Sequence, residues 1–253
     1  MPRFALLLEY DGTPFSGWQR QSVDLSVQGV LEAAVFKFSG EHVVTRSAGR
    51  TDAGVHALGQ VVHVDLAKDW EPGRVRDALN FHLRPHPVVV LSCARVSDAF
   101  DARFSAVQRR YVYRLLTRRA PPVLDCNRVW WLPSSLDADA MADAAQVLVG
   151  HHDFTTFRAT QCQSPTAMKT LDRFDVERVG DEIRCTVASR SFLHNQVRSM
   201  VGSLKHVGEV KWTKSDLAQA LSARNRNACG VVAPAAGLYL DEVRYPPELQ
   251  PPW

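Results

Sequence analysis

Residues 46–57 read Arg-Ser-Ala-Gly-Arg-Thr-Asp-Ala-Gly-Val-His-Ala, and apolar, strand-like residues flank this stretch on both sides. Gly49 and Gly54 bracket Asp52, and glycines let the backbone approach a ligand closely. Arg50 stands two residues before the aspartate, where its charge can keep the carboxylate ionised. An ionised, positioned carboxylate can act as a nucleophile or base. The same spacing also describes a tight turn in which the aspartate bonds its own backbone, and on spacing alone the turn is favoured.

The composition is that of an ordinary globular protein. The chain has 253 residues, of which 45% are hydrophobic and 23% charged, enough for one large or two modest domains with a substantial core. The net charge of +3 excludes a strongly basic tail. No stretch approaches the length of a membrane span. The five cysteines are scattered without Cys-x-x-Cys spacing, which indicates reduced thiols in the cytoplasm rather than a zinc site or a disulfide framework.

Positive charge concentrates in one segment, residues 103–119, which holds six arginines and no acidic residue. These arginines are Arg103, Arg109, Arg110, Arg114, Arg118 and Arg119. They are typical either of a solvated strand face or of a phosphate-binding stripe. The interleaved Tyr111 and Tyr113 favour the second interpretation, because a tyrosine that faces a nucleic acid can stack on an extruded base.

Hydrophobic periodicity and turn signals predict a mixed α/β chain. The predicted strands span residues 4–10, 42–48, 58–66, 88–96, 109–116, 171–179, 182–189 and 237–245. The predicted helices run from an N-cap at Ser26 to Gly40, from Pro72 to about residue 83, from 136 to Gly150, from 195 to 207 and from 216 to 223. A Gly180-Asp181 turn joins two of the strands. Strands and helices follow in similar order in both halves, and the Pro-rich residues 119–122 mark the expected junction.

The stretch around Asp52 closely resembles the signature of the pseudouridine synthases that modify positions 38–40 in the tRNA anticodon stem-loop. Further segments resemble the same family in the same order from near the first residue to near the last. These segments are residues 10–12, 17–21, 27–28, 100–106, 111, 154–158, 161–164, 192–202 and 237–240. In that family the residue matching Asp52 is the catalytic nucleophile, the one matching Tyr111 packs on the target uracil, and the one matching Arg198 pairs with the aspartate.

The resemblance implies an α/β (α+β) fold of two ferredoxin-like subdomains, residues 1–118 and 119–253. Their mostly antiparallel strands would form one continuous sheet, with Asp52 at the floor of a central basic cleft. It also implies a cytoplasmic homodimer that acts on tRNA and requires no metal and no organic cofactor.

The expected catalytic residues are Asp52, Arg50, Tyr111 and Arg198, with Tyr111, Arg50, Arg109 and Arg110 binding substrate. Asp52 would attack C1′ of the ribose or abstract the C2′ proton, and the sequence does not choose between the two. His56, His63 and His194 are expected to be structural.

Two other interpretations of the sequence compete. One is a non-catalytic RNA-binding protein. The other is a hydrolase that pairs Asp52 with a second acid, Asp65 or Asp69.

Overall fold

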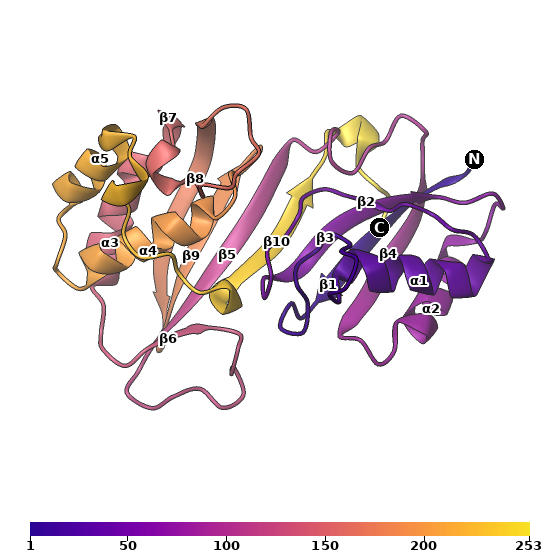
Figure 1. Ribbon diagram of the computed structural model, residues 1–253, viewed down its shortest axis with the longest axis horizontal. Helices are drawn as coiled ribbons and strands as arrows, with labels where there is room; N and C mark the ends of the chain where they lie inside the picture. Colours follow the sequence, from indigo (N-terminus) through magenta and orange to yellow (C-terminus); the bar gives the residue numbers. More distant parts are fainter. The chain divides into compact units, whose positions relative to one another are not determined.

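The computed structural model describes residues 1–253, which form two compact units. Unit 1 comprises residues 1–109 and 239–253, and unit 2 comprises residues 110–238 (Figure 1). Ten β-strands and five α-helices confirm the predicted mixed α/β class, and most strand pairs are antiparallel. The units are not consecutive halves of the chain, because the last strand returns to unit 1.

None of the helices combines the length and the apolar character needed to cross a membrane.

The strands of unit 1 lie in the order β4-β1-β3-β10. They span Val88–Val96, Arg3–Tyr10, His56–Asp65 and Leu238–Arg244, and the short β2, Arg46–Ser47, pairs with β3. β1 is antiparallel to both neighbours and its Phe4, Ala5 and Leu6 are fully buried, as expected of a strand inside a sheet. β10 pairs with β3 in the parallel sense, with Tyr239 opposite His56. The C-terminal strand thereby reaches the start of β3, beside the loop that carries Asp52.

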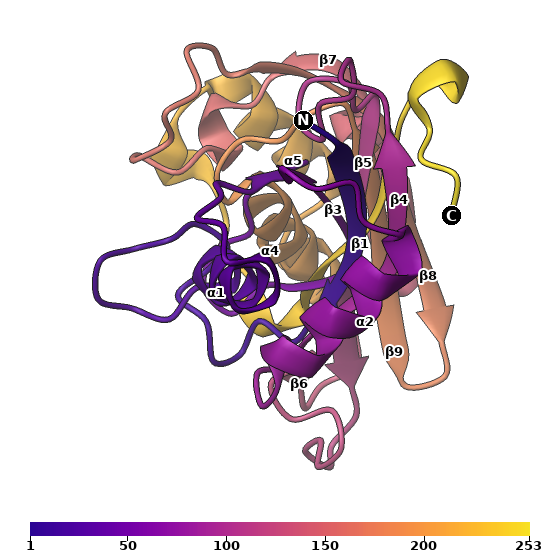
Figure 2. The same ribbon diagram turned by 90° about the vertical axis from the view of Figure 1, so that its right-hand side faces the viewer.

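Both helices of unit 1 lie on one face of its strands (Figures 1 and 2). In α1, Val27–Ser39, the predicted caps are confirmed: the Ser26 hydroxyl accepts from the Gly29 N–H, and Gly40 is left-handed with φ 75°. α2, Pro72–Leu83, has its proline in the first turn and Glu71 as N-cap. These caps fix the ends of both helices against the sheet.

The predicted strand 42–48 shortens to Arg46–Ser47, because side chains of α1 take the backbone groups of Thr45. The Glu32 carboxylate accepts from the Thr45 N–H at 2.9 Å, and the Gln28 side chain donates to the Thr45 carbonyl at 3.1 Å. A residue whose N–H and C=O are both occupied in this way cannot join a strand ladder.

Unit 2 has its strands in the order β5-β9-β8-β7, and β6 pairs in parallel with β5. Their bounds are Gln108–Thr117 for β5, Trp130–Leu132 for β6, Gly150–Asp153 for β7, Met168–Val179 for β8 and Glu182–Ser189 for β9. The predicted turn between β8 and β9 is confirmed, with Gly180 at φ 61°. Three helices gather on one face of these strands (Figure 1): α3 Ala138–Ala145, α4 Gln196–Gly208 and α5 Lys214–Ala223.

Short 3-10 helices complete the chain. They span Gln146–Leu148, Thr155–Phe157, Arg226–Ala228, Ala235–Gly237 and Pro247–Leu249. The first of them takes up the end of the helix that the sequence predicts to run on to Gly150, so α3 is shorter than predicted.

Helix α4 packs closely against the extended segment 231–233. The Ala233 N–H donates to the carbonyl of Arg198, and a Cβ on Gly202 would lie 1.7 Å from the carbonyl oxygen of Val231. Only glycine permits this approach, which holds the segment on the helix that carries Arg198.

We therefore expect Gly202→Ala to lower the free energy of unfolding by about 1–3 kcal/mol through overpacking. An exposed helix interior would instead gain about 1 kcal/mol from the same change. Urea denaturation measures the difference. The comparison variant is Gly73→Ala in the first turn of α2, where the nearest atoms are the side-chain oxygens of the N-cap Glu71 rather than backbone, so only the cap is disturbed. An unchanged midpoint for Gly202→Ala would contradict the close packing.

Candidate active site

The loop that carries Asp52 is fixed through its main chain. The Ala48 N–H donates to Val61 at 2.8 Å, and the carbonyl of Thr51 accepts from the Trp18 N–H at 3.0 Å. The carbonyl of Asp52 itself accepts from the Val55 N–H at 3.1 Å. Arg50 is exposed and Asp52 is half-buried. The carboxylate therefore sits on a rigid turn at the surface of unit 1, so the turn and the active-site interpretations of the sequence are compatible.

The segment after β1 packs directly beneath this turn. A Cβ on Gly12 would lie 2.1 Å from the carbonyl oxygen of Val55. The Gly12 N–H donates to Nδ1 of the buried His56 at 3.0 Å, and the imidazole stacks on the ring of Tyr239. His56 is thus structural, as predicted, and the Tyr10-Asp11-Gly12 segment serves to support the loop.

Two buried side chains, Tyr10 and Gln60, hold the loop from inside, and this role was predicted for neither of them. The Tyr10 hydroxyl hydrogen-bonds the Thr51 hydroxyl at 2.8 Å. Burial raises the pKa of Tyr10 to about 12, although hydrogen bonds with Thr51 and Gln60 act in the opposite direction. Gln60 is fully buried and donates to the carbonyl of Gly49 at 2.7 Å. The sequence held one signal for Gln60, since a polar side chain within the apolar run of β3 indicates a buried hydrogen bond. The phenol stays protonated near neutral pH, so Tyr10 is a neutral anchor rather than a base.

Arg109 holds the same loop from another side and is only 8% exposed. Its Nη2 donates to the carbonyls of Ala48 at 2.7 Å and Arg103 at 2.5 Å, its Nε donates to Ala48 at 3.2 Å, and its Nη1 donates to Ala106 at 3.1 Å. These hydrogen bonds direct the guanidinium at main-chain oxygens, and the substrate contact that the sequence suggested for Arg109 stays a prediction. Arg109 joins the strand that leads to Asp52 with the turn that carries Arg103.

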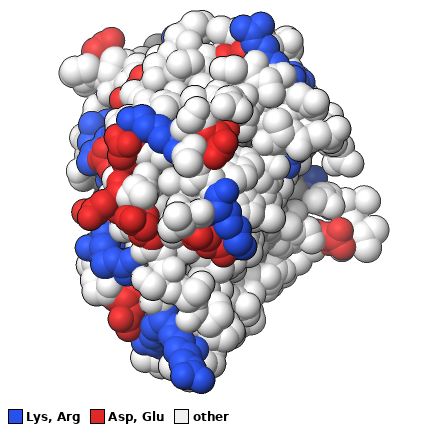
Figure 3. Space-filling model, turned by 90° about the vertical axis from the view of Figure 1, so that its left-hand side faces the viewer, with Lys and Arg blue, Asp and Glu red and all other residues white.

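The arginine segment as a whole is used in different ways. Arg114 pairs with Glu182 and Asp125, whereas Arg103, Arg118 and Arg119 are exposed and Arg110 is half-buried. The face over α3 and α5 also mixes basic and acidic side chains (Figure 3), as in the Lys214–Asp143 pair. Any phosphate-binding role in this segment therefore falls on a subset of its arginines.

Unit 2 carries Tyr111 and Arg110 on β5 and Arg198 on α4. The Tyr111 ring is buried and meets Phe192 edge-on, with centroids 5.2 Å apart. Strand alternation places Tyr113 on the same buried side, where its hydroxyl donates to the carbonyl of Pro234 at 2.8 Å. Tyr113 is thus the structural tyrosine that the sequence predicts, and Phe192 is an addition to the surroundings of Tyr111.

The Arg198 guanidinium is oriented by its own unit. Its Nε donates to the carbonyl of Ala233 at 2.7 Å, and its Nη1 donates to the Asn195 side chain at 2.8 Å. Asn195 precedes α4 in a left-handed conformation with φ 62°. Asp52, Arg50 and Arg109 belong to unit 1, and Arg110, Tyr111 and Arg198 to unit 2. The contact between Arg198 and Asp52 stays a prediction.

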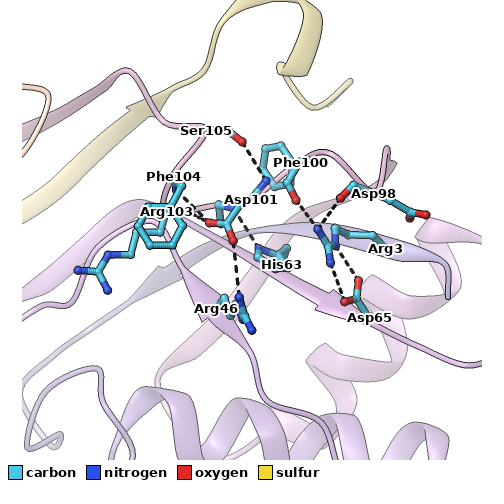
Figure 4. A network of polar contacts seen from close by, with 11 residues as sticks. Arg3, Arg46, His63, Asp65, Asp98, Phe100, Asp101, Arg103, Phe104 and Ser105 are labelled. Carbon is cyan, nitrogen blue, oxygen red and sulfur yellow. Dashed lines mark hydrogen bonds and ion pairs between the residues drawn. The ribbon is translucent and has the colours of Figure 1, made fainter.

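The acids that a hydrolase would pair with Asp52 lie elsewhere. Asp65 ends β3, a strand of ten residues that begins just after the Asp52 loop, so about 30 Å separates the two ends. A glycosidase pair needs carboxyl groups within about 10 Å. Arg3 binds Asp65 through two hydrogen bonds, which lower the pKa of that carboxyl (Figure 4). Asp69 pairs with Arg95, which lies opposite Phe4 near the start of β1, the end of that strand where Asp65 also lies. Neither Asp65 nor Asp69 is therefore placed to form such a pair with Asp52.

His63 is also structural. Its Nδ1 accepts from the Ala102 N–H at 3.0 Å (Figure 4). Burial lowers the pKa of His63, and the Arg3 guanidinium acts in the same direction. A neutral ring with Nδ1 as acceptor fits this environment. No group of three or more His, Cys, Asp or Glu side chains is placed to hold a metal ion, and all five cysteines are free.

Comparison with known proteins gives consistent matches. The family model described as tRNA pseudouridine synthase matches residues 7–105 and 144–246. A protein of Azorhizobium caulinodans named tRNA pseudouridine synthase A is 60% identical over 249 residues, covering 98% of this chain and 96% of its own length. Proteins of the same name from Paramagnetospirillum magneticum and Brucella ovis are 59% and 58% identical, covering 97% of this chain and 96% and 98% of their own.

The Arg109 geometry makes a prediction about local stability. Arg109→Lys keeps the charge but loses the planar fork that serves three carbonyls. We expect amide hydrogen exchange in residues 48–54 and 101–106 to accelerate about 10-fold or more, since each lost bond to a charged donor costs roughly 1.5–3 kcal/mol. Mass spectrometry of exchanged peptides measures this, with the α2 amides as internal control. Equal acceleration throughout unit 1 would contradict a local clamp.

Proposed function

The chain belongs to the tRNA pseudouridine synthase family, and we propose that it isomerises uridine to pseudouridine in the tRNA anticodon stem-loop at positions 38–40, with Asp52 as nucleophile. The observation that carries this proposal is the loop of residues 46–57. It has the family signature, lies inside the matched segment 7–105, and holds one half-buried carboxylate on a fixed main chain. Relatives about 60% identical over nearly the whole chain support the same activity.

The reaction needs the target uridine outside its stack, because its reacting atoms are otherwise inaccessible. Extrusion costs a few kcal/mol, and less in a loop or near the end of a stem. Arg50 is exposed beside Asp52, where it can fill the vacated space or hold the flanking phosphate. Tyr111 offers its ring to the extruded base. These two side chains would keep the base out of its stack during the reaction.

Asp52 then acts on the nucleotide. Either its carboxylate attacks C1′ as the bond to N1 breaks, or it removes the C2′ proton to give a glycal. The uracil turns and rejoins through C5, so that one C1′–N1 bond is replaced by one C1′–C5 bond. In the first route the ester bond between Asp52 and C1′ breaks as C5 bonds C1′, and in the second Asp52 returns the proton to C2′. The hydrogen at C5 leaves as a proton, and N1 gains one. Arg198 would keep the carboxylate anionic and aimed.

The remaining features of the proposal concern assembly and location. We propose a homodimer in which one tRNA contacts both subunits, with Asp52 at the floor of a basic cleft. The free cysteines and the tRNA substrate suit the cytoplasm. Arg110 and Arg50 would contact phosphates, whereas Arg109 acts mainly on the protein backbone.

Tritium release from tRNA labelled at uracil C5 tests the reaction directly, because bond formation at C5 must expel that hydrogen. We expect release by the wild type and a loss of roughly 10³-fold or more for Asp52→Asn, which removes the nucleophile but keeps its size. Equal release by both proteins would remove Asp52 from its role. Tight tRNA binding without any release would instead support the non-catalytic RNA-binding alternative.

Arg50 can be tested through the salt dependence of tRNA binding. If Arg50 contacts a phosphate, Arg50→Gln should lower the slope of log Kd against log salt by about 0.7–0.9, the value for one released counterion. The matched control is Arg76→Gln on α2, whose guanidinium pairs with Asp77; its slope should equal that of the wild type. A normal slope with reduced turnover would show that Arg50 fills the space left by the base.

A further inference from the structure

A phenylalanine stands at the surface of unit 1 in the turn formed by residues 101–106. Phe104 is 74% exposed, although its neighbours in sequence Phe100, Ala102 and Ala106 are buried. The Arg103 guanidinium lies over its ring, 5.5 Å from the centroid. The reaction proposed above does not use Arg103 or Phe104.

The turn that presents the pair is rigid. The Asp101 carboxylate accepts from the N–H groups of Arg103 at 2.8 Å and Phe104 at 2.9 Å, and the Ser105 hydroxyl accepts from the Asp101 N–H at 3.0 Å (Figure 4). Burial acts to raise the pKa of Asp101, but the two N–H donors together with the nearby His63 and Arg46 outweigh it, so the pKa is lowered. The carboxylate therefore stays ionised and keeps both residues facing outward.

Arg109 places this turn beside the candidate active site. One nitrogen, Nη2, donates both to the carbonyl of Arg103 and to the carbonyl of Ala48. The two carbonyls therefore lie side by side, and Ala48 precedes Asp52 by only four residues. These residues all belong to unit 1. The pair is thus held at a fixed distance from the catalytic loop.

The chemistry of the surface fits a polyanion that carries aromatic groups. Arg103 is exposed, and Arg46, which is also exposed, reaches toward the opposite side of Asp101 with 3.9 Å between charged atoms. Figure 4 shows the Arg103 guanidinium pointing away from the polar network. A phenylalanine ring offers a stacking surface to any base, and neighbouring guanidinium groups offer contacts to phosphates. A protein partner would be expected to meet a more apolar core than one ring with a guanidinium over it.

We infer that Arg103 and Phe104 form a nucleotide-stacking platform that binds an unpaired nucleotide of the substrate RNA next to the target uridine. The identity of the RNA rests on the proposed function. The platform acts in binding: it holds RNA near the Asp52 loop and does not touch the reacting atoms.

The test compares Phe104→Ala, Phe104→Trp and Arg103→Gln with Phe81→Ala. Phe81 is a matched control, since it is 70% exposed on α2. We expect Phe104→Ala to raise the Kd for tRNA and the KM for tritium release about 5- to 100-fold, with kcat within about 3-fold of the wild type. Phe104→Trp should bind like the wild type, Arg103→Gln should fall between, and Phe81→Ala should change nothing.

Three results would overturn the inference. They are an unchanged Kd for Phe104→Ala, a loss of kcat at unchanged Kd, and a change of oligomeric state by sedimentation that accounts for weaker binding. The last would assign the ring to self-association. Melting temperatures check that each variant is folded. If Phe104→Ala does not fold, the Kd of Phe104→Trp still tests whether an aromatic ring at this position is sufficient for binding. If wild type binds tRNA without tritium release, the proposed function fails, while the Kd comparison still judges the platform.

Discussion

The candidate active site depends on how one buried cation is satisfied. Arg109 lies inside unit 1, where a guanidinium without partners would be very costly. Three carbonyls, those of Ala48, Arg103 and Ala106, accept its hydrogens. Because those carbonyls belong to the strand before the Asp52 loop and to the 101–106 turn, satisfying the charge also fixes the two segments together. A lysine could not do this, since its donors do not form a planar fork.

Around this clamp, the residues that hold the site differ from those expected to perform chemistry. Asp52 and Arg50 are accessible to a substrate, whereas Tyr10 and Gln60 are buried and bond the loop from inside. Both buried groups are neutral, and through Thr51 and Gly49 they restrict the position of the loop that carries Asp52. Preorganisation of this kind would serve the role proposed for Asp52 as a single nucleophile.

The sequence predicted elements well where the signal was local. The caps of α1, the start of α2 and the whole of β4 and β9 follow from Ser26, Gly40, Pro72 and apolar runs bounded by turns. It failed where a distant group intervened. The strand before the Asp52 loop is short because Glu32 and Gln28 on α1 bind Thr45, and no window around Thr45 contains that information. The pairing of β10 with β3 could not be predicted from local sequence either, since it joins residues far apart in the chain.

The same limit explains the arginine segment, which matters most for RNA binding. Sequence reveals how many guanidinium groups occur between residues 103 and 119, but not which ones the protein uses internally. Arg109 serves the backbone and Arg114 serves two acids, so part of the stripe is already engaged before RNA arrives. The net charge is only +3, and the face over α3 and α5 carries both signs of charge (Figure 3), so attraction for RNA has to come from local groups of arginines. Recognition must then depend on a few well-placed contacts, in which stacking supplements phosphate binding.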